Sequence, residues 1–473
     1  MAPAQLLVVL DGTIVNIALP SADAELGLGA VNRQWVITAY LLTFGGLLLI
    51  GGRVGSAIGH RRAFIIGLIG FAVPSLIGGL AWSAEVLIAA RALQGAFAAL
   101  LAPAALTLLS ISFTEERERG RAFGVFAAVG AAGSAIGLLL GGALTDFAGW
   151  RWCLYINVPI AVLVAIGAAI TPRGAAVKQS GRIDVFGALL SAAGIAAIVI
   201  GIGRLDGQEV SVPVVTALLV GGLLLLVGFV LVERAAPDPI LPLAILKNPA
   251  RAGSFIAIAL MFLAMFGFYL FMSYYMQDQL GYPPLNAGLV LLIHAVAALI
   301  GSMLIAGRLL GRVSAAVLVG AGLFAAAAGL AVLTFLGSGA TNVLATHLVP
   351  AMVLTGLGMG MVITVTASTA TEGVAVHEIG AASAAYNASQ QLGAALGVAL
   401  LNAVAVISSS GHRAVGAGGD DGAVVHGYTV ALAVSAGILV AAAILAAILL
   451  GRRHRGFEDP PRPDHRAEPA HGS

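Results

Sequence analysis

The feature of this chain that most constrains its fold is a succession of apolar runs, each about as long as a membrane is thick. A transmembrane helix needs about 20 mostly apolar residues. The 473-residue chain contains fourteen such runs between charged or turn-rich breaks, at approximately 2–20, 35–52, 63–81, 86–111, 122–144, 152–170, 183–203, 212–232, 252–274, 286–307, 313–336, 343–371, 380–408 and 428–450. We therefore expect an all-α polytopic membrane protein with fourteen transmembrane helices.

Composition excludes the alternative of several soluble domains. Apolar side chains make up 59% of the chain and charged side chains 10%, whereas soluble domains carry about 25% charged residues. Mean hydropathy is +1.01. Because so few charges cannot cover a water-soluble protein of this length, the expected environment is the lipid bilayer. The net charge of +2 gives no indication of nucleic-acid binding.

The distribution of basic residues predicts the orientation in the membrane. Cytoplasmic loops of membrane proteins are enriched in Lys and Arg. With the N-terminus inside, 19 of the 24 basic residues fall in cytoplasmic loops or the C-terminal tail, and the outside loops hold only Arg33, Arg151, Arg204 and Arg413. A wrong number of helices would destroy this asymmetry, because every later loop would change sides. The pattern predicts fourteen helices, both termini cytoplasmic, in the cell membrane.

Several kinds of catalytic site are excluded by residues that the sequence lacks. The single Cys153 cannot form an internal disulfide or a multi-cysteine metal site. Neither lysine, Lys178 or Lys247, follows a glycine, so no Gly-Lys phosphate-binding loop exists. The zinc motif HExxH and the nucleophile elbow GxSxG are also missing. We expect no metal, no cofactor and no enzymatic activity, and any transport would draw on an ion gradient or a partner.

The two ends of the chain carry separate predictions. The first apolar run begins at Met1 without a basic flank and reaches Pro20, and it lacks the features of a signal peptide. This predicts that the cytoplasmic end of the first helix is cut short and that the natural start codon lies upstream; the alternative is a short helix that thins the bilayer locally. Residues 451–473 are polar and proline-rich, which predicts a disordered cytoplasmic tail.

Ionisable residues at membrane depth are candidates for function, because each costs about 2.5–3.5 kcal/mol to insert. Asp11 lies halfway along the first run and is the only acid well inside any run. Arg91 lies near the start of the fourth run, where Gln94 shares its helix face, and His294 lies in the tenth. Each has a structural alternative: Asp11 could accept hydrogen bonds from a neighbouring helix, Arg91 could hold a carbonyl or carboxylate, and His294 could be a neutral core residue.

Amide side chains mark one face of the thirteenth run. Asn387, Gln391 and Asn402 follow a spacing that keeps them on one side of a helix. They could join neighbouring helices, at about 0.6 kcal/mol per contact, or line a wet cavity. Asn16 lies five residues after Asp11 and therefore on a different face. Our candidates for the substrate cavity are Asn16, Gln94, His294, Asn387 and Gln391.

Small residues recur every four positions in two of the runs. The two stripes are Gly133, Gly137 and Gly141 in the fifth run and Ser389, Gly393 and Gly397 in the thirteenth. Such stripes let helix backbones approach closely and slide. In two helices that lie eight apart in order, they suit two bundles that rock against each other.

Several longer motifs combine these residues. They are LDGTIVNIALP (10–20), RALQGAFAAL (91–100), GLLLGGALT (137–145), GWRWCLYINVPI (149–160) and NASQQLGAALGVAL (387–400). Together they resemble the 14-helix drug/proton antiporter branch of the major facilitator superfamily. The segments 233–246 and 274–289 are similar to its later signatures, and the resemblance covers essentially the whole chain.

The resemblance implies a major facilitator fold, with two six-helix bundles at 1–171 and 252–450 and two inserted helices in the linker 172–251. It also implies a monomer that exports amphipathic, often cationic compounds in exchange for protons by alternating access. Asp11 and Arg91 would then serve proton coupling. The antiporter glycine motif would comprise Gly133, Gly137, Gly141 and Gly142.

The sequence also departs from the family pattern. The segment 51–62 resembles the superfamily's gating loop, through Gly52, Gly55, Gly59, Arg61 and Arg62. An acid is expected where Ser56 stands, and a proline where Leu138 stands. Relatives commonly carry proline in place of His294 and often arginine in place of Gln390. These departures bear on the strength of inward closure and on activity, and they leave the expected fold unchanged.

The main functional hypothesis is a proton-coupled drug exporter in which Asp11 alternates between its protonated and charged forms, so that drug and proton compete for one carboxylate. One alternative is the same fold exporting an endogenous metabolite or a self-made natural product. A second is a polytopic membrane enzyme, for which the sequence shows no reactive cluster around Cys153. A third is a non-transporting sensor, for which the tail is too short to hold an output domain.

Overall fold

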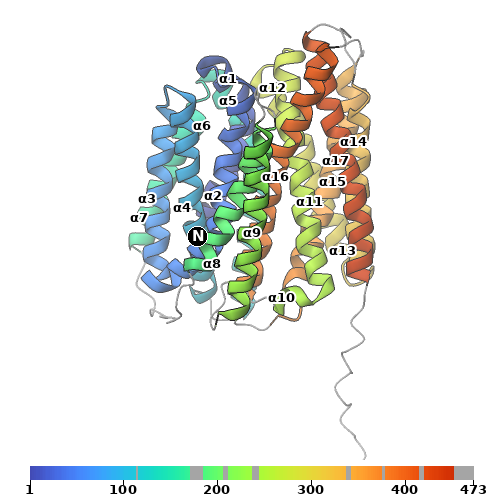
Figure 1. The fold of residues 1–473 in the computed structure, drawn as a ribbon. Helices are drawn as coiled ribbons and strands as arrows, with labels where there is room; N and C mark the ends of the chain where they lie inside the picture. The colour runs from blue at the N-terminus through green and yellow to red at the C-terminus, as the bar shows by residue number, and fades with distance from the viewer. Residues whose placement is uncertain are drawn as a thin grey trace, which may run out of the picture.

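The computed structural model is a bundle of long, roughly parallel and antiparallel helices (Figure 1). It describes residues 1–112, 116–170, 185–205, 211–236, 244–336, 342–374, 379–414 and 420–451. The predicted disorder of the tail, and the basic residues Arg173, Lys178 and Arg182 of the linker, lie outside these residues.

The helices of the first third of the chain are α1 (Ala2–Leu26), α2 (Gly29–Ile58), α3 (His60–Gly79), α4 (Ala84–Ser112), α5 (Glu116–Phe147), α6 (Trp152–Tyr155) and α7 (Asn157–Ile170). Two helices follow, α8 (Val185–Gly203) and α9 (Val212–Ala235). The remainder comprises α10 (Ala244–Lys247), α11 (Pro249–Tyr274), η1 (Tyr275–Gln279), α12 (Pro284–Ile300), η2 (Gly301–Ala306), α13 (Gly307–Leu309), α14 (Ala315–Leu333), η3 (Leu344–Leu348), α15 (Val349–Thr371), α16 (Ile379–Ala414) and α17 (Asp420–Gly451), in which the η elements are π-helical.

Many of these helices are long and apolar enough to cross a membrane. Among the described residues, eleven helices meet this condition, or twelve if the pair 32–48 and 50–58, which is bent by 56°, counts as one span. Two shorter apolar helices, Ala132–Phe147 and Leu189–Gly203, come in addition. Large apolar side chains are exposed on the outer faces, for example Leu163, Leu224 and Phe324, as expected for surfaces in contact with lipid.

Glycines in a left-handed conformation mark the two ends of the bundle. Gly27 ends α1 with φ 60° and ψ 45°, and its N–H bonds the carbonyl of Asp23. Gly59 joins α2 to α3 with φ 93°. Residues other than glycine adopt this region only at a cost, so both turns depend on glycine. The end of the bundle at the α1–α2 turn is called the Gly27 end below, and the end at the α2–α3 turn is called the Gly59 end.

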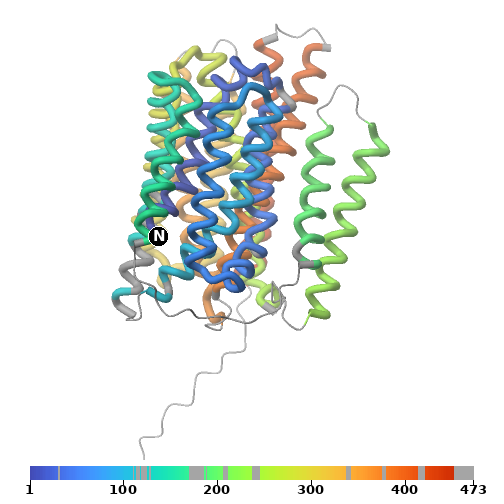
Figure 2. The backbone as a smooth tube through the Cα atoms, turned by 90° about the vertical axis from the view of Figure 1, so that its left-hand side faces the viewer, coloured from blue at the N-terminus to red at the C-terminus, as the bar shows by residue number. Residues whose placement is uncertain are grey.

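Helix contacts divide most of the chain into two groups. α1 to α7 contact mainly one another, as do α11 to α17, and these sets are called the N-terminal group and the C-terminal group. The groups meet where α2 crosses α16 and where α5 crosses α12. Figure 2 shows α8 and α9 standing beside the rest of the bundle, and α8 lies against both α2 and α16. α8 therefore covers the seam between the groups on this side, and α9 packs against α8.

The glycine stripes lie inside the groups rather than between them. A Cβ built on Gly137 would lie 3.1 Å from the carbonyl oxygen of Leu10, and one on Gly397 would lie 2.0 Å from that of Leu263. The stripes therefore hold α5 against α1 and α16 against α11. Of the four glycines of the antiporter motif, Gly142 is the one that faces the other group, where its Cβ would lie 2.8 Å from the carbonyl oxygen of Pro284 in α12. The stripes were expected to suit two bundles that rock against each other; in the structure their close backbone contacts lie within each group.

Candidate functional site

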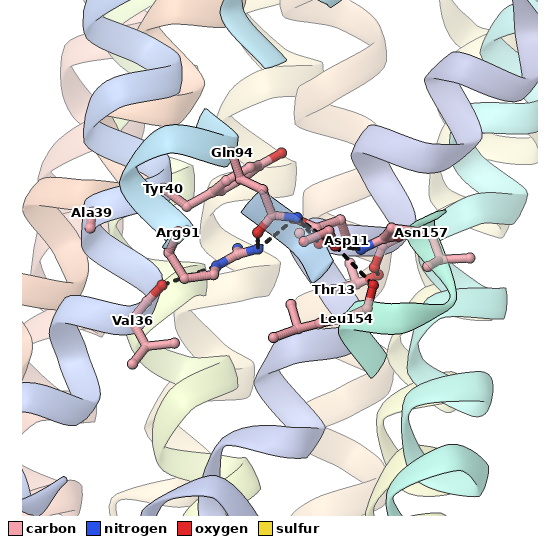
Figure 3. Close-up of polar contacts among 12 residues, drawn as sticks. Asp11, Thr13, Val36, Ala39, Tyr40, Arg91, Gln94, Leu154 and Asn157 are labelled. Atoms are coloured by element: carbon pink, nitrogen blue, oxygen red, sulfur yellow. Dashed lines mark hydrogen bonds and ion pairs between the residues drawn. The ribbon is translucent and has the colours of Figure 1, made fainter. Parts of the chain in front are cut away.

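A buried polar network surrounds Asp11 in the middle of the N-terminal group. Asp11 projects from α1, and its side chain is fully buried. Arg91 and Gln94 reach it from α4, and Asn157 reaches it from the first turn of α7 (Figure 3). Residues that lie up to 146 positions apart in the sequence therefore meet at one carboxylate.

Both carboxylate oxygens of Asp11 accept hydrogen bonds. Oδ2 lies 2.6 Å from a guanidinium nitrogen of Arg91, which makes this a buried ion pair. Oδ1 accepts from Nε2 of Gln94 at 3.0 Å and from Nδ2 of Asn157 at 2.7 Å. Because all three partners are donors, they complement an ionised carboxylate, which can only accept.

Further bonds fix the groups that surround Asp11. The Oγ of Ser75, on α3, accepts from Gln94 at 3.0 Å and from Asn157 at 3.1 Å. The same hydroxyl donates to the carbonyl oxygen of Leu154 at 2.8 Å. The amides of Gln94 and Asn157 are thereby held in the orientation that aims their N–H groups at Asp11.

Arg91 also ties the network to α2. Its Nε donates to the carbonyl oxygen of Val36 at 3.2 Å. Its guanidinium carbon lies 4.3 Å from the ring centroid of Tyr40, a cation–π contact. Within α4, Arg91 also donates from Nη1 to Oε1 of Gln94 at 2.8 Å. Arg91 therefore links α1, α2 and α4 through a single charge.

In this network the charge state of Asp11 is linked to the positions of the donors around it. A buried pair is costly to create, and removing one partner alone leaves an uncompensated charge. Protonation of Asp11 would turn one acceptor oxygen into a donor, which faces only donors in this arrangement. Uptake of a proton would therefore require Arg91, Gln94 or Asn157 to reorient around Asp11.

Comparison with known proteins decides the family. A family model described as Major Facilitator Superfamily matches residues 1–398. The chain belongs to the Major Facilitator Superfamily. It is 48% identical to the puromycin resistance protein pur8 of Streptomyces alboniger over 460 residues, which is 96% of this chain and 91% of that protein. It is 40% identical to the cephamycin export protein CmcT of Amycolatopsis lactamdurans over 414 residues, which is 87% of this chain and 85% of that protein.

Solved structures show the same fold. The TM-score to an auto-inhibited peptide transporter of the POT family is 0.70, with 16% identity and coverage of 97% of this chain and 96% of that one. The chain is therefore a multi-pass cell-membrane transporter of small molecules, as its sequence predicts. Because the superfamily and the matched relatives are transporters, the chain is not an enzyme, which confirms that prediction.

Within this major facilitator protein, the predicted cavity residues do not form one cluster. Gln94 belongs to the Asp11 network. Asn16 is buried on α1 and donates to the carbonyl oxygen of Gly12 in its own helix at 3.0 Å. Asn387 likewise donates to its own helix, to Ser383 at 3.0 Å. Gln391 faces α2 at the seam, since a Cβ built on Gly45 would lie 2.8 Å from its Cβ.

His294 lies in the C-terminal group, in an aromatic setting. Its Nδ1 lies 2.9 Å from Oγ1 of Thr355. Its ring centroid lies 5.2 Å from that of Tyr269 and 5.7 Å from that of Phe268. The side chain is buried, and its Nε2 has no hydrogen-bond partner among the residues that the structure describes. These contacts place His294 in the core of its own group and outside the Asp11 network.

The gating-loop residues act within the N-terminal group. Arg61 donates from Nε and Nη2 to the carbonyl oxygen of Ala168, at 3.1 and 2.9 Å, and from Nη2 to that of Ala169 at 2.6 Å. It thus holds the last carbonyls of α7, where a cation is favourable. Ser56 bonds its own helix at Gly52, 3.2 Å away. Arg62 is exposed.

Three members of the network were not selected from the sequence. Asn157, Ser75 and Tyr40 all contact Asp11 or its partners. Asn157 carried a usable signal, because an amide in the apolar stretch WRWCLYINVP needs a buried partner. Ser75 and Tyr40 carried none, since both residue types occur widely in transmembrane helices. Among the described residues, no group of three or more His, Cys, Asp or Glu could hold a metal ion.

Proposed function

We propose that this major facilitator protein is a proton-coupled exporter of amphipathic, often cationic antibiotics. The observation that carries the proposal is the Asp11 network, the buried ion pair among three donors. Intramembrane acids are costly and mark proton or ion pathways. Support for the cargo comes from relatives over most of the chain that are named for puromycin resistance and cephamycin export.

In the proposed cycle, Asp11 exchanges its bond to Arg91 for a proton. The protonated acid releases the guanidinium, which shifts α4 relative to α1 and favours one orientation of the transporter. A cationic compound that enters the site would favour the charged acid, so that compound and proton compete. Moving one extra charge across 100 mV supplies about 2.3 kcal/mol, which supports a roughly fifty-fold gradient of a monocation.

The proposal includes the topology and the assembly. The helices would form fourteen spans, with bundles at 1–171 and 252–450, two inserted spans in the linker, and both termini in the cytoplasm. The Gly59 end would face the cytoplasm, in line with Arg53, Arg61 and Arg62 near it. The transporter would act as a monomer. A fluorescent protein that folds only in the cytoplasm, fused after residue 473, should report cytoplasmic placement.

The decisive experiment measures compound-evoked proton movement. Purified protein is reconstituted in proteoliposomes with a trapped pH dye, and puromycin is added as the probe. Wild type should release protons on addition, and an uncoupler should abolish the response. Asp11→Asn should lose it, because a neutral amide cannot exchange a proton. Asp146→Asn, which changes an exposed acid on α5, is the matched control and should respond as wild type.

Two outcomes would contradict the proposal. Unchanged proton release in Asp11→Asn would remove Asp11 from the coupling mechanism. Absence of any uncoupler-sensitive change in the accumulation of any tested compound by cells that express the protein would contradict efflux itself.

A second candidate function, export of a natural product made by the producing cell, is favoured by the relative named for cephamycin export. This function uses the same fold and transport mechanism with a different exported compound. Deletion in the native host should then trap a self-made compound inside the cell, whereas a defensive pump would leave secretion unchanged.

A further inference from the structure

Among the described residues, the side-chain hydrogen bonds that join the two helix groups lie along the second half of α1, toward the Gly27 end. They connect α1 with α11 and its π-helical extension η1. Ser273 donates from Oγ to the carbonyl oxygen of Asn16 at 2.7 Å. Gln277 donates from Nε2 to the carbonyl oxygen of Ile17 at 3.2 Å and to Oγ of Ser273 at 3.0 Å. Two polar side chains of one group therefore hold two backbone carbonyls of the other.

Pro20 explains why a backbone carbonyl is available inside a helix. In an α-helix, the carbonyl of residue 16 accepts from the N–H of residue 20. Residue 20 is proline and has no N–H, so α1 continues to Leu26 with the Asn16 carbonyl lacking this bond. At membrane depth an unsatisfied carbonyl costs several kcal/mol. Ser273 supplies the missing donor from the other group.

A second set of contacts lies one to two turns nearer the end of α1. The hydroxyl of Tyr274 donates to Oδ2 of Asp23 at 3.2 Å. Oδ1 of the same carboxylate accepts from the backbone N–H of Gly29 at 2.9 Å, which fixes it at the α1–α2 turn. The guanidinium carbon of Arg33, on α2, lies 4.4 Å from the ring centroid of Tyr274. Tyr274 is thus held between an acid and a cation of the N-terminal group.

Arg33 makes a further contact with the C-terminal group. Its guanidinium also lies within electrostatic reach of the hydroxyl of Tyr428 on α17. Tyr428 in turn stacks on Phe271, with ring centroids 5.1 Å apart and planes at 24°. Asp278 of η1 lies within electrostatic reach of the same guanidinium. Both tyrosines are buried. The Arg33 guanidinium therefore lies against side chains of α11 and α17, two helices that contact each other.

We propose that these contacts form a two-tier latch that holds the Gly27 end closed. The lower tier is the carbonyl of Asn16, freed by Pro20, with Ser273. The upper tier is Asp23 and Arg33 with Tyr274 and Tyr428. Each tier has its two sides on different helix groups, so separation of the groups at this end breaks both at once. The strength of the latch sets the ratio of the closed to the open state of the Gly27 end.

The test measures distances across the two ends of the full-length protein in proteoliposomes by spin-label spectroscopy. Cys153→Ala removes the native thiol. Labels are placed on exposed positions, at Ala24 and Asp421 for the Gly27 end and at Ile58 and Ser314 for the Gly59 end. In this background the Gly27 pair should give mainly one short distance.

Weakening either tier should lengthen the Gly27 distance and shorten the Gly59 distance. Loss of one interhelical hydrogen bond is expected to raise the ratio of open to closed molecules roughly threefold. Ser273→Ala and Tyr274→Phe should each do so, and the double variant should give roughly tenfold. Ser254→Ala and Tyr269→Phe are the matched controls, because these α11 residues bond only within the C-terminal group, to Ala250 and Met359, and should leave both distances unchanged.

Pro20→Ala provides a sharper test of the lower tier. It restores an N–H that competes with Ser273 for the Asn16 carbonyl, so it should open the Gly27 end although it removes a helix break. In the Ser273→Ala background it should have no further effect, since the bond from Ser273 to the Asn16 carbonyl is already lost. Such non-additivity is the signature of two residues that act on one contact.

The latch is overturned if Ser273→Ala/Tyr274→Phe leaves the Gly27 distances as in the parent, or if Pro20→Ala adds its own opening to that of Ser273→Ala. The distances are read without a proton gradient and without an exported compound. Failure of the latch is therefore distinguishable from failure of the proposed antiport.

Discussion

The two helix groups are packed alike but differ in what they bury. In the N-terminal group, α5 lies against α1 through Gly133, Gly137 and Gly141. In the C-terminal group, α16 lies against α11 through Gly393 and Gly397. The same device, close approach of two backbones over glycine, is used at corresponding places in the chain order.

The polar centres of the two groups are different in kind. The N-terminal group buries a charged pair, Asp11 and Arg91, and meets the acid with three donors. The C-terminal group buries His294, whose Nδ1 meets the Thr355 hydroxyl and whose Nε2 has no partner in the described part of the chain. Because both groups pack through glycines but only the N-terminal group has the Asp11–Arg91 pair, the glycine packing does not depend on the ion pair. The predictions below test this contrast, from the largest expected effect to the smallest.

Asp11→Leu should cost about 3–5 kcal/mol of folding free energy, because it leaves Arg91 buried without its counter-charge. The double variant Asp11→Leu/Arg91→Met should recover most of that loss, since neither charge remains. Thermal unfolding of the purified protein, followed by size-exclusion chromatography, measures both. A single variant as stable as wild type would show that the pair is not the charge centre of its group.

Gly397→Ala should cost about 1–3 kcal/mol through overpacking. Its new Cβ would lie 2.0 Å from the carbonyl oxygen of Leu263, so α16 must move off α11. Gly141→Ala should cost less, because its Cβ would lie 2.9 Å from the carbonyl oxygen of Ile14. Gly437→Ala on α17 is the control, with nothing within 4 Å. Unfolding midpoints in the same detergent should follow this order; equal losses at all three would refute the packing role.

Asn157→Leu should cost about 1 kcal/mol in stability, the value of an interhelical hydrogen bond in a membrane. It should also reduce puromycin-evoked proton release, because the acid loses a donor at 2.7 Å. Asn387→Leu serves for comparison, since that amide bonds only its own helix at Ser383. Unfolding measures the loss of stability, and proton release in proteoliposomes measures the loss of coupling. Full release from Asn157→Leu would place Asn157 outside the coupling step.

His294→Phe should change stability by less than about 1 kcal/mol and leave proton release intact. The substitution loses the bond to Thr355 but also removes the buried Nε2 that has no partner, and the two effects oppose each other. The ring contacts with Tyr269 and Phe268 can persist. Loss of uncoupler-sensitive transport in this variant would show that the polar centres of both helix groups, and not the Asp11 network alone, take part in coupling.

Local sequence patterns predicted the helices well and their partners poorly. The apolar run at 2–20 predicted the first helix, yet α1 continues to Leu26 through Pro20. The reason is tertiary, because Ser273 satisfies the carbonyl that proline leaves open. The glycine spacing likewise predicted close helix contact but no partner helix, since spacing on one helix carries no information about which helix faces it.

The sequence by itself determined the membrane environment and the helical class, and it singled out Asp11 as a candidate, because the cost of burying charge in lipid depends on residue type and position in a run. It also predicted the family that comparison confirms. Only the tertiary structure decided that Asp11 meets Arg91, Gln94 and Asn157, that His294 lies apart from them, and that Pro20 opens a docking point for Ser273. These contacts join residues far apart in the chain, and their geometry is set by how whole helices cross.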